Sequence, residues 1–362
     1  MSRSIVVSGY YGFGNAGDEA ILAALIRSLE TTGTSLVPVV LSATPADTSR
    51  QHGVASIFRY DLPAIARVLR ACSGFISGGG TLLQDATGPR SVLYYLGLLR
   101  WAQRWGKPTF VYAQGVGPVR SSLYRVWMRR VLRRATYVSV RDRRSAALLK
   151  ALGVPASLID VVADPVLLLE PAPTDRAELI LHEEGLRTDA APIIIAPRPT
   201  AGQEQLIAQL AAGADRLVEE GYAIWLLPMQ PAVDTAVCYR IRERMRHPAT
   251  ILRGDYRPEE LLALMTYAKL VIGIRLHALI MAVNVGVPVV GLSYDPKVDG
   301  FLEEVGKIPL APIQAVSKAW LVREALSILR NWDNHRRWIE TRRDHLRKRA
   351  LRPAQVIAAY LG

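Results

Sequence analysis

Cysteine is scarce in this sequence, and its scarcity excludes two kinds of architecture. The 362 residues contain only Cys72 and Cys238, and both have apolar neighbours. A disulfide framework needs several paired cysteines, and a structural zinc site needs thiolate or imidazole ligands at short spacing. The sequence therefore predicts neither disulfides nor a zinc site, and it suits a reducing, cytosolic compartment.

Long apolar runs are also missing. No window approaches the roughly 18 consecutive apolar residues that a membrane-spanning helix requires. The first residues pass directly into an apolar segment at Ile5, which leaves no room for a signal peptide. We therefore expect a cytoplasmic protein whose only contact with a membrane is peripheral, on the inner face of the plasma membrane.

Acidic residues are outnumbered by basic ones. The 45 Lys and Arg face 32 Asp and Glu, which gives a formal net charge of +13 and predicts an anionic partner. Much of the excess lies in residues 120–150 and 336–352. Tyr124, Trp127 and Leu132 recur among the arginines at helical spacing, which favours a basic amphipathic helix over a nucleic-acid module. We predict contact with the cytoplasmic membrane surface and no nucleic acid.

Short β-branched runs alternate with helical patterns, which predicts two Rossmann-like α/β domains with parallel strands. The expected strands are 5–8, 36–41, 74–77, 109–112, 137–140, 158–162, 193–196, 223–227, 250–252, 270–274 and 289–292. Pro171 and Pro173 mark a linker between domains at 1–170 and 174–315. Residues 316–362 show only helical periodicity and predict a basic helical tail that could pack back on the first domain.

Polar residues gather at the ends of the predicted strands, where ligands bind in open parallel sheets, so we expect one cleft between the domains to collect them. The first such segment, Gly12–Gly17, fits a dinucleotide-binding pattern. Two features disfavour nicotinamide binding: Asp18 and Glu19 would repel a pyrophosphate, and the second strand ends at Leu41-Ser42 without a ribose-binding acid. Glu19 suits a helix start, whereas Asp18 could reach a bound hydroxyl from the glycine turn.

Three glycines follow the third predicted strand. Gly78, Gly79 and Gly80 offer backbone N–H groups that could hold an anion or let a sugar approach closely. The alternative is a tight turn into a helix. Gln84 and Asp85 add polar side chains at the same strand end, and the combination favours a binding site.

Arg275 and His277 follow an apolar strand at the mouth of a helix, where peptide N–H groups favour an anion. Arg198 follows another strand between two prolines, which fix its backbone. The two arginines could bind a small dianion at both ends, beside a histidine able to move protons. The alternatives are an ion pair for Arg275 and a helix cap for His277. The remaining histidines are expected to be solvated: His52, His182, His247, His335 and His345.

These segments together resemble the polysaccharide pyruvyl transferase family. The likeness covers most of the chain and rests on Gly9-Tyr10-Tyr11-Gly12-Phe13-Gly14-Asn15-Ala16-Gly17-Asp18-Glu19, Gly78-Gly79-Gly80-Thr81-Leu82-Leu83-Gln84-Asp85, Arg275-Leu276-His277 and Tyr294-Asp295-Pro296-Lys297. The last two are the most specific. More narrowly, the chain resembles the bacterial cell-surface-anchoring branch, which adds a pyruvate ketal to N-acetylmannosamine in a secondary cell-wall polymer bound by S-layer proteins.

The resemblance implies a two-domain fold like that of GT-B glycosyltransferases, phosphoenolpyruvate as donor and a lipid-diphosphate-linked amino sugar as acceptor. The donor-binding residues are expected to be Arg198, Arg275, His277 and Lys297. The acceptor-binding residues are expected to be Asn15, Asp18, Gly79, Gly80, Gln84 and Asp85. His277 is the expected acid and Asp18 the expected base, and the scheme requires no metal and no other cofactor.

Two other functions stay open at this point. A nucleotide-sugar-dependent glycosyltransferase of the same architecture would bind a nucleotide diphosphate instead of phosphoenolpyruvate. A non-catalytic polysaccharide- or lipid-binding protein would keep its function after loss of both Arg275 and His277.

Overall fold

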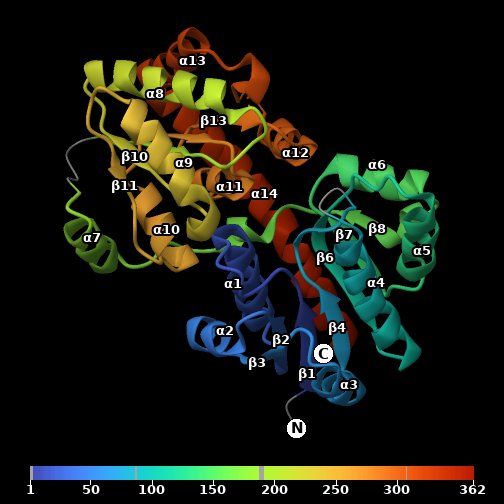
Figure 1. The fold of residues 1–362 in the computed structure, drawn as a ribbon. Helices are drawn as coiled ribbons and strands as arrows, with labels where there is room; N and C mark the ends of the chain where they lie inside the picture. The colour runs from blue at the N-terminus through green and yellow to red at the C-terminus, as the bar shows by residue number, and fades with distance from the viewer. Residues whose placement is uncertain (1–2, 86–87, 187–190, 307) are drawn as a thin grey trace. The chain divides into compact units, whose positions relative to one another are not determined.

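The computed structural model describes residues 3–85, 88–186, 191–306 and 308–362. Contacts divide these residues into two units. Unit 1 comprises the residues up to 13, 18–168 and 346–362, and unit 2 comprises 14–17 and 169–345. Each unit contains one parallel sheet covered by helices (Figure 1).

The sheet of unit 1 has the strand order β3-β2-β1-β4-β6-β7-β8, and β5 pairs with β6. Its strands are β1 (Arg3–Ser8), β2 (Leu36–Ser42), β3 (Ala55–Phe58), β4 (Gly74–Ser77), β5 (Gly80–Leu83), β6 (Thr109–Val116), β7 (Tyr137–Val140) and β8 (Ile159–Val161). Its helices are α1 (Ala16–Thr31), α2 (Pro45–His52), α3 (Leu62–Ala71), α4 (Pro89–Arg104), α5 (Ser122–Leu132) and α6 (Arg143–Ala151). Short 3₁₀ turns cover Ala156–Leu158 and Pro165–Leu168.

Strand β1 shows why this sheet is parallel and central. Ile5 and Val7 belong to one hydrophobic cluster and Val6 to another, and all three side chains are fully buried. A strand that is apolar on both faces fits a parallel sheet with helices on each side.

The sheet of unit 2 has the strand order β11-β10-β9-β12-β13-β14. Its strands are β9 (Ile193–Ala196), β10 (Ile224–Leu226), β11 (Thr250–Ile251), β12 (Leu270–Gly273), β13 (Val289–Ser293) and β14 (Leu310–Pro312). Its helices are α7 (Thr174–Glu183), α8 (Gln203–Glu219), α9 (Pro231–Arg244), α10 (Pro258–Met265), α11 (Leu276–Asn284), α12 (Pro296–Val305) and α13 (Lys318–Arg330), with a 3₁₀ turn at Ile313–Ala315. Counted within its own sheet, this order is the 3-2-1-4-5-6 order of a doubly wound dinucleotide-binding fold.

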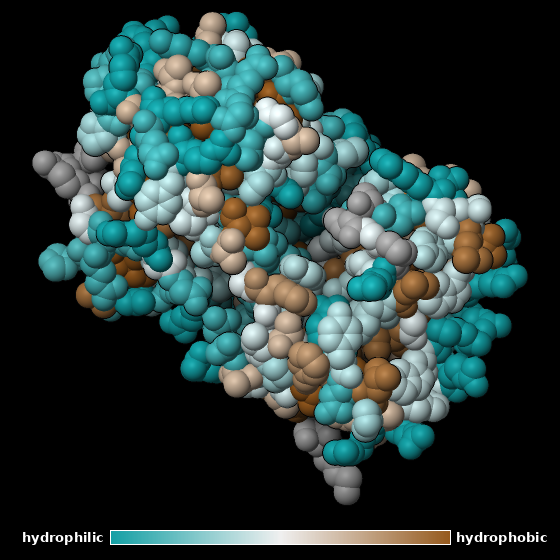
Figure 2. Space-filling model, in the orientation of Figure 1, coloured by the Kyte–Doolittle hydropathy of each residue, from teal (hydrophilic) through white to brown (hydrophobic). Residues whose placement is uncertain are grey.

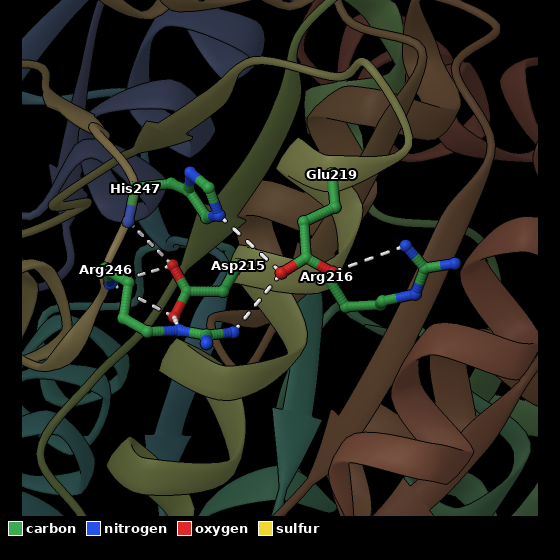
Figure 3. Close-up of polar contacts among 5 residues, drawn as sticks. All are labelled: Asp215, Arg216, Glu219, Arg246 and His247. Atoms are coloured by element: carbon green, nitrogen blue, oxygen red, sulfur yellow. Dashed lines mark hydrogen bonds and ion pairs between the residues drawn. The ribbon is translucent and has the colours of Figure 1, made fainter.

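A polar cluster fixes the segment that leads from α9 into β11 (Figure 3). Asp215, which is 3% exposed, accepts hydrogen bonds of 2.9 Å from the backbone N–H groups of Arg246 and His247. Glu219, one turn along α8, lies 3.2 Å from Arg246 Nη2 and 3.6 Å from His247 Nε2. The buried aspartate therefore orders the backbone, and the exposed glutamate adds weaker surface pairs.

The chain ends in a long helix, α14 (Trp332–Leu361). Its residues from 346 onward belong to unit 1, where Ala354, Ile357 and Leu361 join the hydrophobic cluster of β1. The helical periodicity predicted from residue 316 onward is confirmed by α13 and α14. Among the described helices, none is long and apolar enough to cross a membrane.

Candidate active site

Seven of the ten predicted site residues follow strands that flank a reversal of the strand order, whereas Gln84 and Asp85 follow β5 and Lys297 follows β13. This reversal falls between β1 and β4 in unit 1 and between β9 and β12 in unit 2. Open parallel sheets bind ligands outside these points. The residues that follow the four strands are Asn15 and Asp18 after β1, Gly79 and Gly80 after β4, Arg198 after β9, and Arg275 and His277 after β12.

In unit 1, the side chain of Asp18 lies over the glycine turn. Its Oδ1 is 3.0 Å from the position that a Cβ would take on Gly80, whose φ is +88°. A Cβ on Gly79 would lie 2.7 Å from Cγ2 of Ile21 in α1. Because any side chain at these glycines would push α1 away, the turn needs glycine to bring Asp18 to this strand end.

The first glycine of the turn is used for packing. Gly78 donates its N–H to the Ser8 carbonyl at 2.7 Å, and an added Cβ would collide with the Tyr11 hydroxyl. This amide is therefore not available to an anion. The chain then enters strand β5 at Gly80 and not the helix that the alternative interpretation of the glycines expected.

Two buried tyrosines, Tyr11 and Tyr95, interact electrostatically with Asp18. Burial raises the pKa of Tyr11 well above its usual value, and the negative charges of Asp18 and Glu19 raise it further. Burial also raises the pKa of Tyr95, and the Asp18 carboxylate adds to the shift. Both phenols therefore stay protonated at neutral pH, so neither tyrosine can act as a base there.

The other predicted acceptor residues differ in how they are held. Asn15 accepts the Gly17 N–H at 3.0 Å and shapes the start of α1. Asp85 Oδ2 accepts the backbone N–H groups of residues 120–121 at 2.7 and 2.8 Å, ahead of α5. Gln84 is partly buried, and its side chain makes no hydrogen bond within the part of the chain that the structure describes. The polar groups left for a ligand within the described residues are therefore the Gln84 amide, the Asn15 amide nitrogen and Asp85 Oδ1.

The carboxylate of Glu19 binds groups of the protein itself, in line with the helix-start role expected for this residue. Its Oε1 accepts the Gly12 N–H at 2.8 Å, and its Oε2 lies 3.3 Å from His52 Nε2. The prediction that His52 is solvated is wrong, because its side chain is only 5% exposed. It is the last residue of α2, and it is buried there against Glu19.

Arg59, directly after β3, is a residue that the sequence analysis missed. It is 5% exposed, and its guanidinium carbon lies 4.4 Å from the ring centre of Tyr94 and 5.1 Å from that of Phe13. Its Nε and Nη1 are buried without a hydrogen-bond partner among the described residues. Contacts with aromatic rings offset part of the cost of burying this cation. The signal in the sequence was an arginine between two aromatic residues, Phe58 and Tyr60.

In unit 2, Arg198 and Arg275 follow neighbouring strands. Gly273 of β12 pairs with Ala196 of β9, so each arginine lies two residues beyond the same register position. Adjacent parallel strands bring such positions to one edge of the sheet. The structure therefore brings the two predicted arginines to the same strand ends.

Arg275 forms an ion pair, which the sequence analysis gave as the alternative to a role in ligand binding. Its Nε and Nη2 lie 2.9 and 2.5 Å from the two carboxylate oxygens of Asp234, whose side chain is fully buried. Nη2 is also 3.3 Å from Gln230 Oε1. Nη1 has no hydrogen-bond partner among the described residues, so this edge of the guanidinium remains available to a ligand.

Arg198 is held by an aromatic ring and not by a carboxylate. Its Nη1 donates to the Tyr294 hydroxyl, and its guanidinium carbon lies 4.2 Å from the ring centre. Its Nε is buried and has no acceptor among the described residues. Lys297, whose Nζ is 5.6 Å from the same ring, pairs with Asp295 at 3.2 Å. Tyr294 thus links two predicted donor-binding cations.

His277 lies in the first turn of α11 and contacts the first turn of α1. A Cβ on Gly17 would collide with the ring of His277, so glycine is required for this approach. Ala16 donates its N–H to the Met229 carbonyl at 2.9 Å, which holds the same segment in unit 2. Within the described ranges, no three His, Cys, Asp or Glu side chains are arranged to hold a metal ion.

Comparison with known proteins assigns the chain to a family. The family model for polysaccharide pyruvyl transferase matches residues 15–296. The chain belongs to the polysaccharide pyruvyl transferase family. It is 23% identical over 394 residues to the amylovoran biosynthesis protein AmsJ of Erwinia amylovora, a match that covers 91% of this chain and 92% of AmsJ. The predicted family is therefore confirmed, and the chain is a pyruvyltransferase of polysaccharide synthesis.

Solved structures confirm the predicted fold class. A glycosyltransferase from Rickettsia africae matches with a TM-score of 0.65 at 12% identity, covering 99% of this chain and 98% of its own. Alr3699/HepE of Anabaena, solved with UDP and glucose, gives a TM-score of 0.64 at 13% identity and covers 99% of both chains. At these identities the likeness shows the fold alone, which is the GT-B fold.

Proposed function

We propose that this pyruvyltransferase takes pyruvate from phosphoenolpyruvate and forms a 4,6-ketal on N-acetylmannosamine of a lipid-diphosphate-linked cell-wall glycan precursor, with release of phosphate. The buried Nε of Arg198, which has no acceptor among the described residues, carries the donor part of the proposal. Arg275 and Lys297 follow strands of the same sheet. Phosphoenolpyruvate has a carboxylate and a phosphate, so it supplies acceptors for the Nε of Arg198 and for the Nη1 of Arg275, while Lys297 adds a positive charge.

The reaction balances without an oxidant or a reductant. The methylene carbon of phosphoenolpyruvate gains a proton, and one sugar hydroxyl bonds to the central carbon. Attack by the second hydroxyl completes the ketal as the carbon–oxygen bond to phosphate breaks. Of the two hydroxyl protons, one balances the proton gained by carbon and the other leaves with phosphate. His277 gives the first proton, and Asp18 accepts the proton of the attacking hydroxyl.

Unit 1 supplies the acceptor side of the proposal. The carboxylate of Asp18 lies over Gly80, and Gln84 offers an amide to sugar hydroxyl groups. The name of AmsJ supports a role in polysaccharide synthesis. A pyruvylated secondary cell-wall polymer would then serve S-layer anchoring. Its lipid-linked precursor would require the enzyme to work as a peripheral protein on the inner face of the plasma membrane.

One incubation tests this proposal. The purified protein is mixed with phosphoenolpyruvate and a lipid-linked amino-sugar disaccharide, and phosphate release and product mass are measured. We expect one phosphate per ketal formed, and no reaction when the 4-hydroxyl of the acceptor is methylated. Arg323→Ala, which changes an exposed arginine of α13, serves as the matched control and should keep full turnover.

Two outcomes of this incubation would contradict the proposed function in whole or in part. An absence of phosphate release, together with binding of UDP, would favour a nucleotide-sugar-dependent glycosyltransferase on the same fold. Phosphate release with a different sugar acceptor would support phosphoenolpyruvate as the donor and would show that the acceptor is a sugar other than N-acetylmannosamine.

A further inference from the structure

The surface of unit 1 between α4 and α5 holds a basic cavity of about 790 Å³. Five arginines and one tryptophan account for most of its lining: Arg100, Arg129, Arg130, Arg133, Arg134 and Trp127. We call this cavity the α4–α5 arginine pocket. None of its lining residues belongs to the candidate active site.

The arginines of the pocket have no counter-charge within the part of the chain that the structure describes. None of the five makes an ion pair or a side-chain hydrogen bond there. The only acid in residues 120–150, Asp142, accepts the Ser145 N–H at 2.7 Å as the cap of α6. Like charges gathered around one cavity repel each other unless an anion enters, so the pocket favours an anionic ligand.

The basic tail behaves differently, although the sequence suggested the same role for both blocks. Arg342 Nη2 donates to the Glu304 carbonyl at 2.7 Å, and Arg347 Nε donates to the Leu167 carbonyl at 2.6 Å. Arg352 lies 2.6 Å from Asp160. Several tail arginines thus bind groups of the protein itself, whereas those of the α4–α5 arginine pocket point to a partner.

Exposed apolar side chains adjoin the pocket. Leu123 is 71% exposed and Val126 is 48% exposed, and the three-residue spacing places both on one face of α5. Val126 also lines the pocket and lies four residues before Arg130. On the part of the surface that α5 forms, hydrophobic and hydrophilic residues lie next to one another (Figure 2). A soluble phosphate needs only the cations, whereas a bilayer surface offers phosphates and an apolar layer together.

We propose that the α4–α5 arginine pocket binds the phosphate groups of anionic phospholipids, while Leu123 and Val126 enter the interfacial layer of the membrane. Arginine suits phosphate oxygens because its planar guanidinium donates two parallel hydrogen bonds. The inference deepens the membrane contact of the proposed function and depends on none of its chemistry.

Vesicle co-sedimentation tests the pocket. The full chain is mixed with vesicles of phosphatidylcholine, with and without phosphatidylglycerol, and the partition coefficient is measured. Arg130→Gln/Arg133→Gln/Arg134→Gln should lower binding to anionic vesicles on the order of 100-fold, because each cation near the surface contributes about a factor of five. The matched control, Arg330→Gln/Arg336→Gln/Arg337→Gln, removes three exposed arginines from α13 and α14 and should change binding far less.

A second variant tests the apolar part. Leu123→Ser/Val126→Ser should reduce the binding that remains at high salt, where screening weakens the electrostatic part. Equal loss in the pocket and control triple variants would reduce the effect to net charge and overturn the proposal. So would binding of inorganic pyrophosphate or duplex DNA without binding of vesicles. Phosphate release from phosphoenolpyruvate with a soluble acceptor should be unchanged in the pocket variant. A failure of the membrane proposal can therefore be distinguished from a failure of the proposed reaction.

Discussion

At the scale of single residues, Arg198 and Arg275 show how two equal charges at the same strand ends can have different roles. Arg275 is neutralised by the buried carboxylate of Asp234. Arg198 contacts Tyr294 and keeps a buried donor without an acceptor among the described residues. We therefore expect Arg275 to contribute to the stability of unit 2 as well as to donor binding, and Arg198 to contribute to donor binding alone.

Arg198→Ala should weaken phosphoenolpyruvate binding by about 2 kcal/mol or more, because hydrogen bonds to a desolvated anion are strong. The melting temperature should hardly change, since no carboxylate loses its partner. Arg198→Lys should restore binding only in part, because lysine lacks the planar pair of donors. Isothermal calorimetry provides the measurement. Unchanged affinity in Arg198→Ala would remove this residue from the donor site.

Arg275→Ala should instead lower the free energy of unfolding by about 3 kcal/mol, because it leaves Asp234 buried and unpaired. The double variant Arg275→Ala/Asp234→Ala should be more stable than Arg275→Ala alone, since it removes the uncompensated charge. Urea unfolding of the three proteins supplies the comparison. Equal stability of Arg275→Ala and the parent would show that the pair does not form in solution.

His277→Gln and Asp18→Asn remove proton transfer while keeping approximate size, and each should lower turnover by about 10² to 10⁴. The two variants should differ in binding, because the proposed function assigns His277 to the donor phosphate and Asp18 to the acceptor hydroxyl. His277→Gln should therefore bind phosphoenolpyruvate less tightly, and Asp18→Asn should bind it normally. Steady-state kinetics and calorimetry separate the two effects. Near-full turnover in Asp18→Asn would return this residue to a helix-start role.

At the scale of the elements, most strands were predictable from the sequence and three were not. Strands β4, β7 and β9 begin and end at the predicted residues. The sequence analysis missed β3, β5 and β14. Strand β3 is a four-residue edge strand with no buried residue, and β5 has four residues directly after the glycines. Glycine is depleted in strands, and an edge strand without buried residues lacks the run of apolar residues that indicates a buried strand.

The candidate site shows the same limit. Residues that follow buried apolar strands, such as Asp18, Arg198 and Arg275, could be placed from the sequence because the ends of parallel strands share one edge of the sheet. Their partners could not, since Asp234 and Tyr294 lie 41 and 96 residues away along the chain from the arginines that they contact. Only tertiary packing brings them together.

Gly17→Ala tests whether the first turn of α1 positions His277. The methyl group would collide with the imidazole, and displacing the ring by about 1 Å should reduce turnover as much as about 10²-fold. The fold should survive, because alanine favours the helix that Gly17 enters. Turnover assays are compared with Gly97→Ala, a helical glycine of α4 with no atom within 4 Å of an added Cβ. Equal turnover in both variants would show that the ring has another position in solution.

At the scale of the whole molecule, helix α14 contributes residues to both units. Its first residues up to His345 belong to unit 2 and the residues from Leu346 onward to unit 1. Arg3 Nη1 donates to the Leu361 carbonyl at 2.5 Å, so the last turn also binds the start of β1. Unit 1 therefore needs the end of the chain to complete its core.

Ile357→Ala should reveal this dependence. The side chain is fully buried in the cluster that contains Ile5 and Phe110, so its truncation should lower the free energy of unfolding of unit 1 by about 2 to 5 kcal/mol. Lys348→Ala, an exposed change in the same helix, should have little effect. Hydrogen exchange resolved by segment is the measurement, because two units can unfold in separate steps. We expect faster exchange in β1, β2 and β4 and unchanged exchange in β9 and β12. Uniform loss of protection across both sheets would instead show that the chain unfolds as one cooperative body.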